Sequence, residues 1–146
     1  MFGTVATSPT YGNRMADEYD GRDGSDRLTY RIALDRDLTD GNSGGMQWGS
    51  EYRLLHRNVY GQLIHVMKPF GLLLLNMKDH RRDGIRIHVT QWHLETLITL
   101  GFQFETAERI MCPGNGHGAN LADRIPYETL LIMRAPGPQL SLLTQV

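Results

Sequence analysis

The sequence has little of what marks a secreted, membrane-spanning or metal-binding protein. Its one cysteine, Cys112, excludes an internal disulfide and fits a reducing cytoplasm, where we expect the protein to reside. The longest apolar run, residues 70–75, is too short to cross a bilayer, and the N-terminus lacks the pattern of a signal peptide, so we expect no membrane partner. The six histidines follow none of the usual ligand spacings, and we therefore expect no bound metal.

An excess of charge of either sign is also absent. The 15 Lys and Arg residues nearly balance the 16 Asp and Glu residues, which leaves a net charge of −1. The chain as a whole is therefore not attracted to nucleic acid, and any such contact must come from a local patch. With 146 residues, of which 40% are hydrophobic, the chain is long enough for one globular domain with a substantial core.

Apolar periodicity predicts an α/β fold in the first half of the chain. A short strand over residues 4–7 ends at Ser8-Pro9, because proline cannot continue a strand ladder. Residues 51–67 form an amphipathic helix that Lys68-Pro69 ends, and its apolar stripe contains Tyr52, Leu55, Val59, Leu63, Val66 and Met67. Residues 72–76, with four consecutive leucines, are typical of a strand buried on both faces, parallel to the first.

The second half predicts one more helix and a closing pair of strands. Thr90 caps a helix that runs to Leu100 and presents Leu94, Leu97 and Ile98 on one face, and Gly101 ends it. Residues 102–111 and 127–133 are expected to form an antiparallel pair. The domain thus spans residues 1–135, and residues 136–146 are expected to be a flexible tail.

An irregular, glycine-rich insertion occupies residues 12–50. Two interpretations fit it equally: a surface loop, or a substrate-facing segment whose aromatic residues stack on bases, namely Tyr19, Tyr30 and Trp48.

The candidate site lies where the first strand runs into its loop. Ser8, Pro9 and Tyr11 follow that strand, and ligands of open α/β sheets bind at the carboxyl ends of strands. A basic cluster follows the leucine-rich strand at the same rim and consists of Lys78, His80, Arg81 and Arg82. This cluster is either a solvated charged turn or a set of contacts to nucleic-acid phosphates.

These residues carry a resemblance to a known family. The run Thr7-Ser8-Pro9-Thr10-Tyr11 resembles the catalytic tetrapeptide of S-adenosylmethionine-dependent DNA amino methyltransferases of the N6-adenine/N4-cytosine type: Asp, Asn or Ser, then two prolines, then an aromatic residue. Residues 68–76 resemble the turn and strand that follow in that family, and Gly101-Phe102 and residues 128–133 are similar to its closing elements. Thr10 replaces the second proline, and Phe70 stands where the family prefers glycine.

The resemblance implies a Rossmann-like methyltransferase fold and a direct methyl transfer to an exocyclic amino group of adenine or cytosine. Ser8 Oγ and the Pro9 carbonyl then accept hydrogen bonds from that amino group, and Tyr11 stacks on the flipped base. The resemblance further implies S-adenosylmethionine as the cofactor, expected to contact Thr7, Ser8 and Pro9, and DNA as the partner, expected to contact the basic cluster. Similar tetrapeptides act on RNA, so RNA remains a possible partner.

The resemblance covers only the C-terminal half of the family's catalytic domain, its strands four to seven. The glycine-rich loop and the acidic residue that hold the cofactor in that family have no counterpart in the sequence. We therefore expect either half of an active enzyme, completed by another polypeptide or a second copy, or a catalytically silent remnant that still binds nucleic acid. The first strand should have one unpaired edge, which favours self-association.

Overall fold

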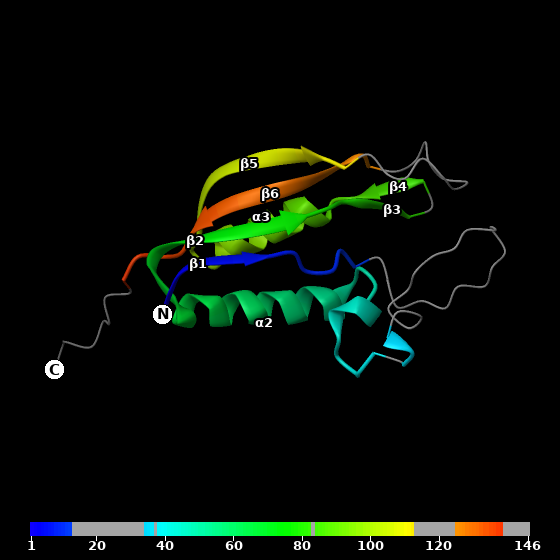
Figure 1. The fold of residues 1–146 in the computed structure, drawn as a ribbon, viewed down its shortest axis with the longest axis horizontal. Coiled ribbons are helices and arrows are strands. Elements are labelled where there is room, and N and C mark those ends of the chain that lie inside the picture. Colours follow the sequence, from blue (N-terminus) through cyan, green and yellow to red (C-terminus); the bar gives the residue numbers. More distant parts are fainter. Residues whose placement is uncertain (13–33, 37, 83, 113–124, 139–146) are drawn as a thin grey trace.

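The computed structural model describes residues 1–12, 34–36, 38–82, 84–112 and 125–138. After strand β1 (Phe2–Thr7), a short 3-10 turn, η1 (Ser43–Gly45), precedes helix α2 (Ser50–Val66). Strand β2 (Met67–Met77), strands β3 (His80–Arg82) and β4 (Ile85–Ile87), and helix α3 (Val89–Thr99) follow. Strands β5 (Gln103–Met111) and β6 (Tyr127–Arg134) complete the elements, which Figure 1 shows from the N- to the C-terminus.

Four strands of the described residues form one sheet in the order β1-β2-β6-β5. Figure 1 shows these strands side by side in that order. β1 is parallel to β2, with Thr4 opposite Leu72 and Thr7 opposite Leu75. β6 is antiparallel to both β2 and β5. The predicted parallel pair and the predicted antiparallel closing pair are both confirmed, and β1 lies at the edge of this sheet with one strand neighbour.

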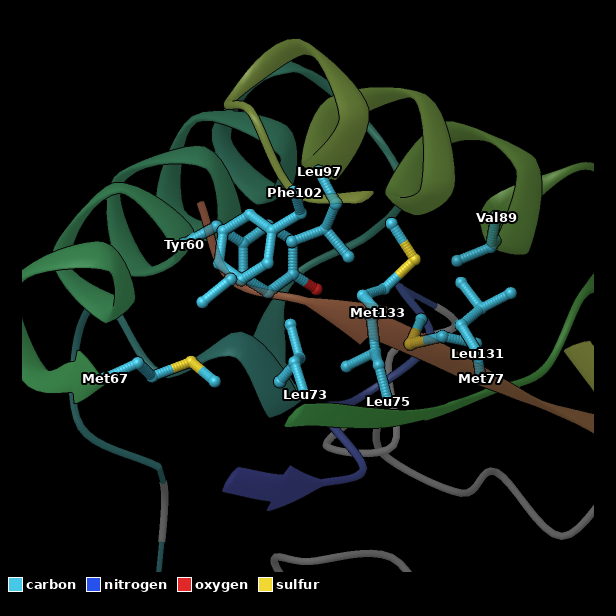
Figure 2. Packing of buried hydrophobic residues seen from close by; sticks show 11 residues of the cluster. Tyr60, Met67, Leu73, Leu75, Met77, Val89, Leu97, Phe102, Leu131 and Met133 are labelled. Atoms are coloured by element: carbon cyan, nitrogen blue, oxygen red, sulfur yellow. The ribbon is translucent and has the colours of Figure 1, made fainter. Parts of the chain in front are cut away.

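Helices α2 and α3 cover the same face of the sheet. Alternation along β2 turns Leu73, Leu75 and Met77 into the core, where they meet side chains from α2, α3 and β6. Figure 2 shows these side chains packed between the two helices and the strands. The intervening residues Leu72 and Leu74 are half-buried on the opposite face, and within the described part of the chain no helix packs there. The expectation of burial on both faces is therefore met on one face.

Helix α2 confirms only part of the predicted apolar stripe: Tyr52 is buried and Leu63 packs against the core, but two valines of the stripe are exposed. Tyr52, His56 and Tyr60 are buried, each one helical turn after the last. Val59 and Val66, which the sequence places on the buried face, are 46% and 42% exposed. The reason is that the buried polar atoms of the tyrosines and His56 find hydrogen-bond partners inside the protein, so aromatic bulk enters the core without an unpaired polar group.

Helix α3 ends as predicted but begins differently. Gly101 has a positive φ of 93°. The amide of Phe102 donates to the carbonyl of Leu97 at 3.0 Å, and that of Gly101 donates to Ile98 at 2.9 Å, which is the hydrogen-bond pattern of a Schellman motif. At the other end the predicted cap, Thr90, lies inside the helix, and its amide donates to the Asp79 carboxylate at 2.8 Å. On the helix, Ile98 is half-exposed rather than buried.

Strand β2 begins at Met67, directly after the last residue of α2. Lys68 and Pro69, which the sequence predicts to end the helix, therefore already lie in the strand. Phe70 has a positive φ of 60°, and the register with β1 shifts at this point. A Cβ on Gly71 would lie 2.9 Å from the carbonyl oxygen of Gly3, which explains the glycine at this position. Pro136, at the start of the predicted tail, accepts a hydrogen bond from the Phe70 amide.

Among the residues that the structure describes, no helix has the length and apolar character that a membrane span needs.

Candidate functional site at the rim of the sheet

The loop after β1 brings the predicted site residues together at the carboxyl ends of β1 and β2. The hydroxyl oxygens of Ser8 and Tyr11 lie 3.1 Å apart, within hydrogen-bond distance. Ser8 is exposed, whereas Pro9 and Tyr11 are half-buried. The loop therefore presents a hydroxyl, a proline carbonyl and an aromatic ring at the edge where ligands of α/β sheets bind.

Two carbonyl groups anchor this loop from the helix side. The Tyr52 hydroxyl donates to the Thr10 carbonyl at 2.5 Å, and the Trp48 amide donates to the Gly12 carbonyl at 2.7 Å. Gly12 has a positive φ of 68°, and a Cβ there would lie 3.1 Å from the Trp48 nitrogen. A side chain at position 12 would thus strain the backbone and crowd its anchor.

A polar pair that sequence reasoning missed lies beside Tyr11. Asn76 Nδ2, near the end of β2, donates to Glu128 Oε2 of β6 at 2.5 Å, while the buried Asn76 Oδ1 has no hydrogen-bond partner among the described residues. Burial raises the pKa of the Tyr11 hydroxyl; the contact with Ser8 opposes this shift, and the neighbouring Glu128 carboxylate adds to it. Tyr11 therefore stays protonated and lies against an acceptor-rich surface.

The predicted basic cluster forms part of a β-hairpin rather than a plain turn. His80, Arg81 and Arg82 form β3, which pairs with β4. Arg81 is exposed and donates to the Gly84 carbonyl at 3.2 Å, and Lys78 is half-exposed. Burial, followed by repulsion from Arg82, lowers the pKa of His80, so this residue is neutral near pH 7. The positive charge of the cluster therefore comes from the lysine and the two arginines.

Two further basic residues that the sequence did not single out lie near Tyr127, Arg86 on β4 of this hairpin and Arg109 on β5. Arg86 on β4 contacts Asp79 Oδ2 at 2.8 Å and donates to the Tyr127 hydroxyl at 2.9 Å. The Arg109 guanidinium lies 4.9 Å from the centre of the Tyr127 ring. The sequence held a signal for Arg86, because it follows the predicted basic cluster closely in the chain and pairs with Arg81 across the hairpin.

The aromatic residues of the glycine-rich insertion divide between two situations. Tyr19 and Tyr30 lie outside the described residues, as do the positions 139–146 of the predicted tail. Trp48 packs against the rings of Tyr52 and Trp92, with centroids 5.4 and 5.5 Å away. Its half-buried ring thus takes part in internal packing.

The fold is similar to part of a solved protein structure. The neighbour, from Thermus thermophilus and described as a presumed DNA modification methylase, aligns with 94% of this chain at a TM-score of 0.55 and 15% identity. The chain spans 46% of that protein's length. No protein-family model matches the chain, and no curated protein matches it. At this identity the likeness shows the fold, a mixed α/β sheet with helices that is consistent with part of a Rossmann-like domain.

Proposed function

We propose that this chain carries the target-base part of an S-adenosylmethionine-dependent DNA methyltransferase that acts on an exocyclic amino group of adenine or cytosine. The observation that carries the proposal is the placement of Ser8, Pro9 and Tyr11 on one anchored loop at the carboxyl end of β1. The fold likeness to a protein described as a DNA methylase supports it, because the sheet and its order are what position that loop.

The chemistry follows from the hydrogen-bonding character of the loop. An exocyclic amino group is a poor nucleophile, since its lone pair is delocalised into the ring of the base. Ser8 Oγ and the Pro9 carbonyl accept hydrogen bonds from this group and favour a more pyramidal, more nucleophilic nitrogen. The Tyr11 ring stacks on the base once the base has left the duplex. The nitrogen gains the methyl group and loses a proton, which passes to solvent or to the Glu128 carboxylate beside Tyr11.

The methyl donor meets the protein at the same rim. Thr7 and Ser8 are exposed there and Pro9 is half-exposed, so their hydroxyls and carbonyl are available to the polar groups of S-adenosylmethionine. When bound, the cofactor supplies a methyl group on a positively charged sulfur. The contribution of the chain is alignment of the acceptor nitrogen with that methyl group.

Nucleic-acid phosphates are the proposed partners of the β3–β4 hairpin. Lys78, Arg81 and Arg82 carry the charge, and neutral His80 contributes a hydrogen bond at most. Such contacts orient the duplex without reading its sequence. Each phosphate contact that is lost should weaken binding and reduce its dependence on salt.

The free edge of β1 is the proposed docking point for a completing polypeptide or a second copy of the chain. β1 pairs with β2 along one edge, and within the described residues no strand pairs with its other edge. Light scattering between 5 and 100 μM, concentrations chosen for the assay, tests self-association. A mass that stays monomeric throughout would leave a separate polypeptide as the remaining form of this proposal.

The function is tested by methyl transfer from radiolabelled S-adenosylmethionine to DNA and, in parallel, to RNA, with the chain completed by its second copy or by its partner polypeptide. Tyr11→Ala should reduce transfer roughly 10- to 100-fold because base stacking is worth about 1–3 kcal/mol, whereas Tyr11→Phe should retain most activity. Ser8→Ala should lower kcat, and Ser50→Ala, an exposed serine at the start of α2, is its matched control.

Fluorescence anisotropy with a labelled DNA duplex provides a second readout that does not depend on turnover. Binding without transfer supports the silent-remnant alternative, and transfer to RNA alone supports an RNA amino methyltransferase. Equal values for wild type and both site variants contradict the roles assigned to Ser8 and Tyr11. Absence of both binding and transfer by the completed protein contradicts the proposed function.

A further inference from the structure

A continuous chain of hydrogen bonds connects the core between α2 and α3 with the site loop. The Tyr60 hydroxyl lies 2.6 Å from His93 Nδ1, and His93 Nε2 lies 3.0 Å from the Tyr52 hydroxyl. The Tyr52 hydroxyl in turn lies 2.5 Å from the Thr10 carbonyl oxygen. Tyr52 and His93 are fully buried, and Tyr60 is 2% exposed. The two bonds to His93 are therefore buried, and the bond to Thr10 is part-buried where the chain reaches the loop.

The direction of each bond in this chain is fixed by the chemistry of its last member. A carbonyl oxygen can only accept a hydrogen bond, so the Tyr52 hydroxyl donates its single hydrogen to the Thr10 carbonyl. Tyr52 must then accept from His93, which requires the hydrogen of the imidazole to be on Nε2. His93 Nδ1 is left as an acceptor, and Tyr60 donates to it. Burial, followed by repulsion from His56, lowers the pKa of His93 to about 2, which keeps the ring neutral.

Ring packing holds the same residues in place. The His56 ring lies 4.0 Å from the Tyr52 ring and 5.2 Å from the His93 ring, and its Nδ1 donates to the Tyr52 carbonyl at 2.8 Å. The Trp92 ring lies 4.9 Å from His93. The Tyr52 hydroxyl is therefore held at one position relative to the loop, and the chain of bonds is a rigid support rather than a set of surface contacts.

We propose that Tyr52, supported by His93 and Tyr60, is the positioning residue of the site loop. Because a peptide group is planar, fixing the Thr10 carbonyl also fixes the amide nitrogen of Tyr11 and the direction in which that residue leaves the backbone. Tyr52 of α2 thus holds the loop at Thr10, while Ser8 and Tyr11 of the same loop lie at the rim of the sheet. The structural part stands by itself; its consequence for catalysis rests on the proposed function.

Tyr52→Phe is the decisive variant because it removes one oxygen and retains the ring that packs on Trp48 and His56. Tyr60→Phe is the matched control: it removes the hydroxyl at the far end and leaves the bond to Thr10 in place. Three readouts are needed: the backbone order parameter of Tyr11, the carbonyl 13C shift of Thr10, and kcat and KM for methyl transfer to a DNA duplex.

Tyr52→Phe should lower the order parameter of Tyr11 from about 0.85 towards 0.6 and shift the Thr10 carbonyl resonance. It should also lower kcat roughly 10- to 100-fold with little change in the KM for S-adenosylmethionine, since misplacement of a reacting group affects the chemical step. Tyr60→Phe should change all three readouts less. Unchanged Tyr11 and Thr10 signals in Tyr52→Phe, or an equal disturbance in Tyr60→Phe, would overturn the positioning role.

The unmodified protein provides a further check that does not depend on how a variant folds. Long-range 15N correlation spectra of His93 should show a neutral ring protonated on Nε2, and a ring protonated on Nδ1 would overturn the proposed direction of the chain. If wild type shows neither DNA binding nor transfer while the nuclear magnetic resonance results are as expected, the proposed function fails and the positioning of the loop by Tyr52 is supported.

Discussion

Replacing Asp79 should separate two contributions that meet at one buried carboxylate. Asp79 is 7% exposed. Its Oδ1 accepts from the Thr90 amide at 2.8 Å, near the start of α3, and its Oδ2 accepts from Arg86 Nε at 2.9 Å. Asp79→Ala removes both bonds, whereas Asp79→Asn retains an oxygen that can accept from Thr90 and loses the ion pair.

The size of each contribution follows from burial. Loss of a side-chain acceptor at a helix N-terminus costs about 1 kcal/mol. The Arg86 side chain is 40% exposed, so its ion pair with Asp79 contributes about 0.5–1 kcal/mol. We therefore expect Asp79→Ala to lower the free energy of unfolding by about 2 kcal/mol and Asp79→Asn by about 1 kcal/mol.

Urea denaturation followed by circular dichroism at pH 7 measures both values. Arg86→Ala is the matched control, because it removes the ion pair and leaves the helix N-terminus capped. Raising the salt concentration should remove a larger fraction of the cost of Asp79→Asn than of Asp79→Ala, since only the ion pair is screened. An Asp79→Asn variant as unstable as Asp79→Ala would show that the helix cap contributes little, and the reasoning would be refuted.

Acid should destabilise the protein through His93. In the unfolded chain this residue takes up a proton below about pH 6.5, whereas in the folded protein, where its pKa is about 2, it stays neutral. The free energy of unfolding should therefore fall by up to ~1.4 kcal/mol per pH unit as the pH drops below about 6.5. Melting temperatures at pH 7 and pH 5 should therefore differ more for wild type than for His93→Gln, and equal differences would contradict the assignment. Gly61→Ala, in a helix with open space around the new methyl group, should stabilise the fold by about 1 kcal/mol in urea denaturation. Gly101→Ala, at a positive φ of 93°, should destabilise it by about 1 kcal/mol, and a stabilising effect there would be inconsistent with the observed helix end.

The strands were predictable because their sequence signals are local. The four leucines of residues 72–75 and the break at Ser8-Pro9 each depend on neighbours in the sequence, and the structure confirms the strands that they predict. Gly101 was predictable for the same reason, since a left-handed helix end needs glycine wherever the helix lies.

The parts that failed depend on contacts between distant segments. Tyr52 and Val59 both fit an apolar stripe on α2, and only the partner across the interface, His93, decides that the tyrosine is buried and the valine exposed. The acceptor at the start of α3 is the carboxylate of Asp79, which the β3–β4 hairpin separates from the helix in the sequence. Glu128 lies at the candidate site because β6 is the neighbour of β2 in the sheet, and the spacing of residues in the sequence does not predict that these two strands are neighbours.

The placement of β1 has a consequence for the order in which the protein folds. Its only strand partner among the described residues is β2, and Thr4 pairs with Leu72, far along the chain. Pairing β1 with β2 closes a long loop, and the entropy lost in closing it must be overcome before the contacts form. The pairs β3–β4 and β5–β6 are closer in the sequence and close shorter loops. We expect β1 to dock late in folding and to detach early under denaturant, which pulsed hydrogen exchange of the Val5 amide would detect. The loop that carries Ser8 and Tyr11 is attached to this strand, so the protein would lose the candidate site before it loses its core.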